Sequence, residues 1–205
     1  MPPILTTGFE PFDGRDVNAS WIAARCLAEL QGANALQLPV VWGAPMRLLA
    51  PLLTGSGPKP GAVISLGEGR PGWFDIETRA RVERGHRTDN SQRLPEPRLI
   101  VDHGPAELKA SINAARLQRA LSQAGFPARI SSEAGAYLCE ETLYTLELLK
   151  QQHADLRLVT FIHLPPFGSR VRVNETNTYC DESVLNSFAL TLGRALLTEL
   201  ALLDF

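Results

Sequence analysis

Residues 156–166 read L-R-L-V-T-F-I-H-L-P-P, and this stretch decides the predicted fold. It is a mainly apolar run with β-branched and aromatic residues, which is typical of a strand buried on both faces. Pro165 and Pro166 close it, because proline cannot donate to a strand ladder. The run A-V-I-S-L-G at residues 62–67 is a second buried strand, ending in glycine. Strands of this kind belong to sheets that helices cover on both faces.

Helical patterns and short apolar runs alternate along the rest of the chain. Further strands are predicted at residues 4–7, 35–42 and 126–132, with a half-exposed strand or hairpin between Trp73 and Asn90. Helices are predicted from a cap at Asn18 or Ser20 to Gly32, over residues 44–53 and 105–125, after Cys139, and from 181 to about 203. This alternation predicts a three-layer α/β/α single domain over residues 1–205, with a mainly parallel, mixed central sheet.

The composition is that of an ordinary soluble globular protein. It is 44% hydrophobic and 20% charged, with a net charge of −2, so neither nucleic acid nor a membrane is an expected partner. No secretory or membrane-spanning pattern is evident, and we expect a cytoplasmic protein. The cysteines are few, widely separated and without C-x-x-C spacing, which predicts free thiols and no metal site.

The loops after the strands are the expected place for a ligand site. Parallel sheets bind ligands beyond the carboxyl ends of their strands. The loops after Thr7, Leu66, Ser132 and Ile162 are therefore predicted to open on one edge of the sheet. The candidate residues in those loops are Phe9, Phe12, Glu68, Arg70, Cys139 and His163.

Cys139 lies in S-S-E-A-G-A-Y-L-C-E-E-T, residues 131–142, at the predicted opening of a helix. A helix N-terminus favours thiolate, although Glu140 and Glu141 oppose a nearby negative charge. His163, at a strand end, is the predicted partner, since a Cys-His pair can share one proton. The residues alone leave open that Cys139 is a small packing residue and that His163 is structural.

A carboxylate usually orients the imidazole of such a pair. Glu77, in D-I-E-T-R, is the first candidate, with Asp75 and Asp89 as alternatives. The other histidines fit the role of base less well. His86 lies in a charged loop, His103 lies at a turn, and His153 lies at a helix end.

Several segments, in order, resemble pyroglutamyl-peptidase I (pyrrolidone-carboxylate peptidase), a family of cysteine peptidases. T-G-F-E-P-F-D-G followed by N-A-S-W resembles its N-terminal signature, and S-S-E-A-G-A-Y-L-C its catalytic-cysteine motif. F-I-H-L-P resembles its catalytic-histidine segment. I-E-T-R-A-R-V, together with the later D-N, resembles the stretch that supplies its catalytic glutamate. V-D-H-G-P-A and A-G-F-P-A-R-I-S-S align too, so the resemblance covers nearly the whole chain.

The resemblance implies removal of N-terminal pyroglutamate from peptides through an acyl-enzyme. Cys139 would be the nucleophile, His163 the general base and then acid, and Glu77 the residue that holds His163. Backbone N–H groups at the helix start would bind the oxyanion, and no metal or organic cofactor is required. A homo-oligomer, dimer or tetramer, is also implied. The alternatives are a thiol hydrolase acting on another small lactam or acyl amide, and a non-enzymatic binding or redox-sensing protein.

The substrate pocket implied by the resemblance is apolar, because the pyroglutamyl ring is neutral. Its predicted residues are Phe9, Phe12, Asn18, Glu68 and Leu138, with core packing as the alternative for the phenylalanines and helix capping for Asn18.

The chain departs from the family pattern at three acids. Glu68, in G-E-G-R, stands where many bacterial members have glutamine; it could accept the lactam N–H but would need Arg70 or Arg87 as an ion partner. Glu140 stands where the family commonly has an asparagine after its cysteine. Glu133 stands where the family has a shorter or neutral residue in the preceding turn.

Overall fold

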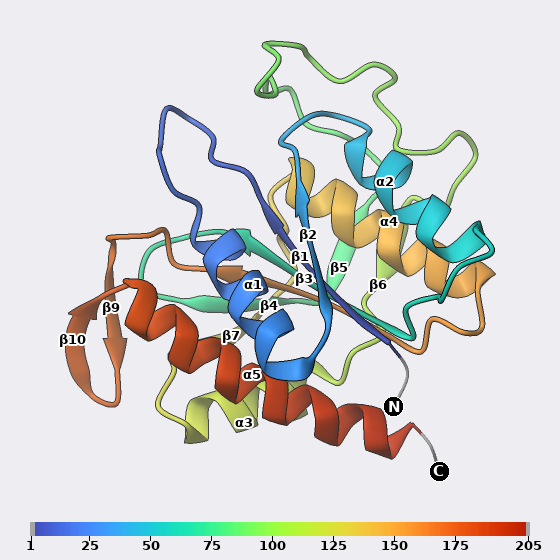
Figure 1. Ribbon diagram of the computed structural model, residues 1–205. Helices are drawn as coiled ribbons and strands as arrows, with labels where there is room; N and C mark the ends of the chain where they lie inside the picture. The colour runs from blue at the N-terminus through green and yellow to red at the C-terminus, as the bar shows by residue number, and fades with distance from the viewer. Residues whose placement is uncertain (1–2, 204–205) are drawn as a thin grey trace.

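The computed structural model describes residues 3–203, and in this part of the chain six strands form the central sheet (Figure 1). Their spatial order is β2-β1-β3-β8-β4-β7. The bounds are β1 Ile4–Phe9, β2 Asn34–Leu38, β3 Ala62–Glu68, β4 Phe74–Glu77, β7 Ala128–Ser131 and β8 Leu158–Leu164. The first four strands in that order are parallel, whereas β4 runs antiparallel to β8 and parallel to β7. The predicted α/β fold with a mainly parallel, mixed sheet is confirmed.

Helices cover both faces of the sheet (Figure 1). One face carries α1 (Ala19–Gln31), α3 (Ala114–Gln123) and α5 (Glu182–Leu202), and the other carries α2 (Ala44–Thr54) and α4 (Leu138–Gln152). Successive side chains of β3 point to opposite faces, so Ile64 packs in the core under α1 and α5 while Val63 packs in the core under α2 and α4. Burial on both sides explains why this strand reads as an uninterrupted apolar run.

Two small antiparallel sheets lie outside the central one. They pair β5 (Arg79–Arg81) with β6 (Glu107–Lys109), and β9 (Arg170–Val173) with β10 (Thr176–Tyr179). The helix predicted over residues 105–125 is therefore wrong in its first part. Residues 107–109 gain ladder hydrogen bonds with β5, and the helix begins only after Asn113, whose side chain accepts from the N–H of Arg116. The β9–β10 hairpin had no counterpart in the sequence-based prediction.

The strand predicted at residues 35–42 is shorter than expected. It ends at Leu38, because Pro39 has no N–H for the ladder and the N–H of Val40 bonds to the Glu10 carboxylate at 2.9 Å. Between Trp73 and Asn90, β4 is fully buried and belongs to the central sheet, whereas the half-exposed strand is β5 alone.

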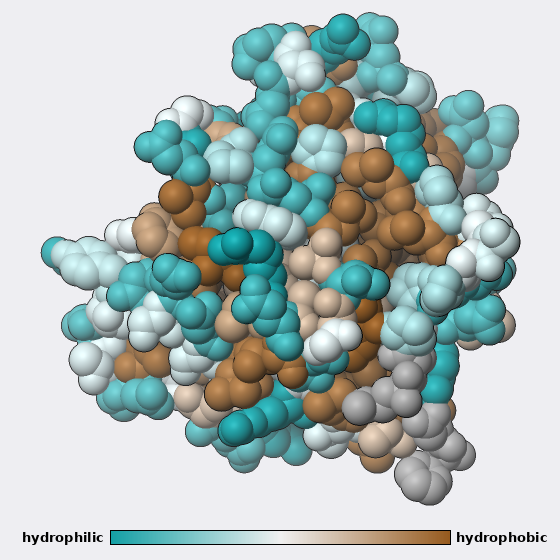
Figure 2. Space-filling view, viewed as in Figure 1, coloured by the Kyte–Doolittle hydropathy of each residue, from teal (hydrophilic) through white to brown (hydrophobic). Residues whose placement is uncertain are grey.

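An apolar area lies over α2 on the face seen in Figure 2. Leu48 and Leu52 of this helix are 38% and 40% exposed. Over residues 3–203, no helix combines the length and the apolar composition needed to cross a membrane.

Gly8 generates a prediction about stability, because β1 approaches α1 closely at this residue. A Cβ on Gly8 would lie 2.5 Å from the carbonyl oxygen of Ser20, and the next residue, Phe9, donates its N–H to the Ser20 hydroxyl at 2.9 Å. We expect Gly8→Ala to lower the free energy of unfolding by about 1–3 kcal/mol, as overpacking does, in urea denaturation.

The matched control for this prediction is Gly57→Ala. A Cβ on Gly57 meets nothing within 4 Å, so its effect should stay within about 0.5 kcal/mol. Equal stability of the two variants would contradict the close-approach argument.

Candidate active site

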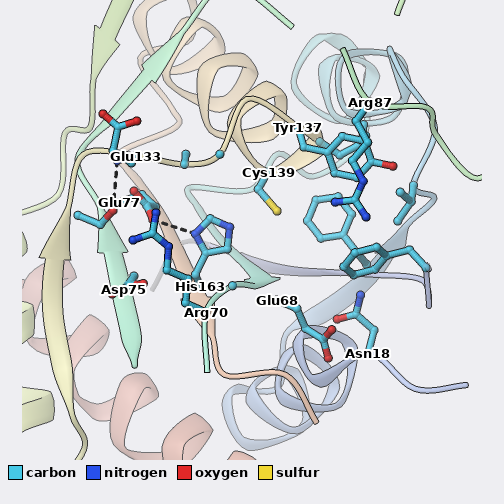
Figure 3. A pocket seen from close by; sticks show the side chains of 18 residues that line it. Asn18, Glu68, Arg70, Asp75, Glu77, Arg87, Glu133, Tyr137, Cys139 and His163 are labelled. Carbon is cyan, nitrogen blue, oxygen red and sulfur yellow. Dashed lines mark hydrogen bonds and ion pairs between the residues drawn. The ribbon is translucent and has the colours of Figure 1, made fainter. Parts of the chain in front are cut away.

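Glu77 and His163 lie on β4 and β8, which are neighbouring antiparallel strands of the sheet. Asp75 is the register partner of His163 across this antiparallel pair, and Glu77, two residues further along β4, lies on the same face of the sheet. Glu77 Oε1 is 2.8 Å from His163 Nδ1, with Glu77 1% and His163 7% exposed. The carboxylate thus fixes the ring and leaves the other ring nitrogen for chemistry (Figure 3).

Cys139 lies in the first turn of α4, after the N-cap residue Tyr137, as the sequence predicted. Figure 3 shows its sulfur in the pocket, beside the imidazole of His163. The space for the sulfur comes from Gly67, the register partner of His163 in β3, because a Cβ there would lie 2.8 Å from Cys139 Sγ. A Cβ on Gly69 would likewise lie 2.7 Å from that of His163. The two glycines of G-E-G therefore let the thiol and the imidazole approach the sheet.

The sequence predicted that four loops open on the same edge of the sheet, and this prediction is wrong for the loop after Ser132. Strand β7 runs antiparallel to β1, β3 and β8, so its carboxyl end points the other way. Because β4 and β7 are short, Ser131 lies opposite Glu77 and the following turn starts beside Glu77 and His163. Residues 132–137 then lead along the pocket to α4, whose first turn holds Cys139.

The environment of His163 raises the pKa of its imidazole. Burial by itself lowers its pKa, but the negative charge and hydrogen bonding of Cys139, together with the hydrogen bond and charge of Glu77, raise the pKa to about 10. An imidazolium at this position stabilises a thiolate on Cys139.

The two acids that follow Cys139 are occupied by structural partners. Glu140, 2% exposed, accepts from the N–H groups of Arg81 at 2.9 Å and Ala136 at 2.6 Å. Ala136 has a left-handed φ of 51°, so this bond also holds a strained turn in place. Glu141 makes a two-point hydrogen-bonded ion pair with the buried Arg84, at 2.7 and 3.0 Å. These partners offset the charges that were expected to oppose the thiolate.

The other acids considered as partners of His163 are bound elsewhere. Asp75 pairs with Arg129. Asp89 anchors a loop by accepting from three backbone N–H groups, at 2.8–3.1 Å, which belong to Trp42, Ser91 and Arg93. Glu133, at the surface, pairs with Arg79 and Arg81. Of the three acids considered for His163, the structure brings only Glu77 to the ring.

A pocket of about 190 Å³ opens beside Cys139 and His163. Its apolar wall consists of Phe9, Phe12, Val40, Tyr137 and Leu138. The Arg87 guanidinium covers this wall, 5.5 Å from the ring centre of Phe12 and 4.6 Å from that of Tyr137. The predicted residues Phe9, Phe12 and Leu138 therefore line one side of a single pocket with the thiol.

Asn18 and Glu68 form the floor of the pocket and also hold the start of α1. The Asn18 side chain accepts from the N–H of Ser20 at 3.0 Å and donates to the carbonyl of Glu10 at 2.9 Å. Glu68 Oε1 accepts from the N–H of Ala19 at 2.7 Å and of Phe167 at 3.2 Å, while Oε2 pairs with Arg15. The helix start and this arginine offset the buried charge.

From the sequence, Arg70 or Arg87 was expected to form the ion pair with Glu68, and the structure corrects this expectation. Arg15 takes that place, and Arg87 pairs with Asp13. Sequence reasoning gave no site role to Tyr137, Val40 or the two glycines around Glu68. The glycines carried a usable signal, since glycine at the end of a buried strand indicates close approach. In the described part of the chain, no group of three or more His, Cys, Asp or Glu side chains is placed to hold a metal ion.

Comparison with known proteins gives a consistent match. A family model described as pyroglutamyl peptidase matches residues 3–192. The chain is 34% identical over 171 residues to pyrrolidone-carboxylate peptidase 1 of Ralstonia nicotianae, covering 80% of this chain and 79% of the relative. It is 35% identical over 199 residues to the pyrrolidone-carboxylate peptidase of Thermococcus onnurineus, covering 94% and 98%.

Solved structures of the same kind share the fold. Pyroglutamyl peptidase I of Bacillus amyloliquefaciens superposes with a TM-score of 0.75 at 23% identity, covering 95% of this chain and 98% of that one. A mutant pyrrolidone carboxyl peptidase of Pyrococcus furiosus superposes with a TM-score of 0.79 at 24% identity, covering 97% and 99%. The resemblance read from the sequence motifs is confirmed, and the chain belongs to the pyroglutamyl peptidase family.

Proposed function

We propose that this protein is a cysteine peptidase that removes N-terminal pyroglutamyl (5-oxoprolyl) residues from peptides, with Cys139, His163 and Glu77 as its triad. The observation that carries the proposal is the buried Glu77–His163 pair beside the Cys139 sulfur, in a pocket with an aromatic wall on one side. Relatives that match most of the chain are named pyrrolidone-carboxylate peptidases, which supports this substrate class.

Acylation begins with the Cys139 thiolate, which attacks the carbonyl carbon of the pyroglutamyl residue. The first amides of α4, at Leu138 and Cys139, have no partner within the helix and donate to the oxyanion. His163 gives its proton to the leaving amine as the C–N bond breaks, and a thioester remains on Cys139. The shortened peptide leaves with a free N-terminus.

Deacylation uses the same imidazole in the opposite sense. Neutral His163 removes a proton from water, which attacks the thioester carbonyl, and pyroglutamate leaves as Cys139 is restored. Glu77 keeps the ring oriented and stabilises its charged form in both steps.

Recognition of the lactam ring follows from its neutrality. Phe9, Phe12 and Leu138 supply flat apolar contacts, and no carboxylate is needed for an ammonium group because the substrate has none. Asn18 keeps one amide N–H beyond its bond to Glu10, and a Glu68 oxygen can accept the lactam N–H. Both residues would thus read the polar edge of the ring.

The wider setting of this activity is also a proposal. The catalytic domain would span residues 1–205, and the protein would be a cytoplasmic homo-oligomer, either a dimer or a tetramer. The apolar area over α2, with Leu48 and Leu52, supports contact with a second copy. Light scattering of the purified protein at several concentrations tests the oligomer, and a monomer throughout would rule it out.

The nucleophile is tested by Cys139→Ala with a fluorogenic pyroglutamyl amide. We expect wild-type turnover and a loss of at least about 10⁴-fold in kcat, because the acyl-enzyme cannot form. Cys26→Ala, on α1 away from the pocket, is the matched control and should keep its activity. Turnover that survives in Cys139→Ala would contradict the triad. A wild-type protein that iodoacetamide labels at Cys139 but that shows no turnover would favour a binding or redox-sensing role.

The role of Glu77 is tested by the pH profile of kcat/KM. The folded pKa of His163 lies above its ordinary 6.5, so the proton needed by the leaving amine is retained through neutral pH and lost as pH rises through about 10. Glu77 is one cause of that rise. We expect Glu77→Gln to move the alkaline limb to lower pH and to reduce kcat.

Asp75→Asn is the control for this profile, since Asp75 faces Arg129 instead of the imidazole. Its alkaline limb should stay at the wild-type position. A Glu77→Gln limb that coincides with the wild-type limb would refute the assignment of Glu77.

A further inference from the structure

The pocket has two chemically different sides, separated by Cys139 and His163. Tyr137, Arg87 and Asn18 lie on one side of the imidazole in Figure 3, and Arg70, Asp75 and Glu133 lie on the other. The first side carries the aromatic wall and accepts the acyl group under the proposed function. The second side is then left for the residue that follows pyroglutamate, whose nitrogen receives the proton of His163.

The acids on this second side already have cationic partners. Asp75, 5% exposed, pairs with Arg129, and its second oxygen lies 3.0 Å from an Nη of that arginine. Glu133 accepts from Arg79 at 2.8 Å and from Arg81 at 2.9 Å. Glu77 is bound to His163. None of these carboxylates is left to bind or repel a leaving group on its own.

Arg70 differs from every other charged residue that lines the pocket. Within residues 3–203 it makes neither an ion pair nor a hydrogen bond, whereas all the other charged lining residues do: Glu68, Asp75, Glu77, Arg87, Glu133 and His163. Its side chain is exposed, and it directly follows Gly69, which packs against the Cβ of His163. One uncompensated guanidinium therefore lies beside the group that protonates the leaving amine.

We propose that Arg70 binds a carboxylate on the residue immediately after pyroglutamate, which makes the enzyme selective for acidic leaving groups. This inference rests on the proposed function and specifies its substrate class. The carboxylate is either the free C-terminus of a pyroglutamyl dipeptide or the side chain of an acidic residue. A guanidinium matches such a group with two parallel N–H donors, and solvent around Arg70 limits the size of the effect.

The test compares kcat/KM within two pairs of peptides. The first pair is pyroglutamyl-alanine with a free carboxylate and its C-terminal amide. The second is pyroglutamyl-glutamate amide and pyroglutamyl-glutamine amide. We expect the wild-type protein to prefer the charged member of at least one pair by about two- to fivefold, as for an exposed ion pair. A preference in the first pair identifies the chain terminus as the ligand, and one in the second identifies the side chain.

Two variants decide whether Arg70 is the cause. Arg70→Gln should bring the ratio within the preferred pair to about one, while Arg194→Gln, an exposed arginine of α5, should keep the wild-type ratio. The wild-type preference should also weaken as salt is added. Thermal unfolding of both variants establishes that they are folded.

The outcomes separate this inference from the proposal on which it rests. Hydrolysis of all four peptides with equal efficiency by the wild type overturns the carboxylate site and leaves the peptidase in place. A preference that persists in Arg70→Gln overturns the assignment of this arginine. No hydrolysis of any pyroglutamyl peptide by the wild type overturns the proposed function itself.

Discussion

His163 is buried between a carboxylate and a thiol, and the chemistry of the site depends on that arrangement. Burial alone would lower its pKa and leave the ring neutral, whereas Cys139 and Glu77 together raise the pKa to about 10. The raised pKa favours the protonated form of His163 through neutral pH, although burial opposes that charge. The hydrogen bond from Nδ1 to Glu77 also determines which ring nitrogen faces the substrate.

The reversal of strand direction between β8 and β4 creates this arrangement. An antiparallel neighbour brings Asp75 opposite His163 and puts Glu77 one pleat repeat further along the same face. On the other side of β8, Gly67 leaves room for the sulfur that α4 delivers. The proposed triad residues thus come from two adjacent strands and the first turn of α4.

Three buried acids near the site have partners that offset their charges. Glu140 supports the turn before Cys139, Glu141 binds Arg84, and Glu68 binds Arg15 and the start of α1. From the sequence alone, Glu68 and Glu140 depart from the family pattern, and Glu140 and Glu141 are expected to oppose a thiolate on Cys139. In the folded protein each has hydrogen-bond or ion-pair partners, so these buried carboxylates near Cys139 and His163 are not left uncompensated.

Much of the fold and the site could be predicted from local pattern. The alternation of buried strands and helices, the helix opening at Cys139, the strand end at His163 and the family motifs all reside in short segments, where periodicity, capping and motif spacing act. The segment over residues 105–125 was misread because Leu108 and its neighbours suit a helix locally, yet gain more by pairing with β5. Tertiary pairing overrides such weak local preference.

The sequence by itself determined the family, the layered α/β architecture and the identity of the candidate nucleophile and base, since these depend on residue type and spacing. Only the tertiary structure decided that β4 and β7 run against the other strands, that Glu77 reaches His163 in preference to Asp75 or Asp89, and that Arg15 serves Glu68. Those outcomes depend on contacts between residues from about 50 to nearly 90 positions apart, whose partners follow from strand direction and packing. No local pattern encodes a partner at that distance.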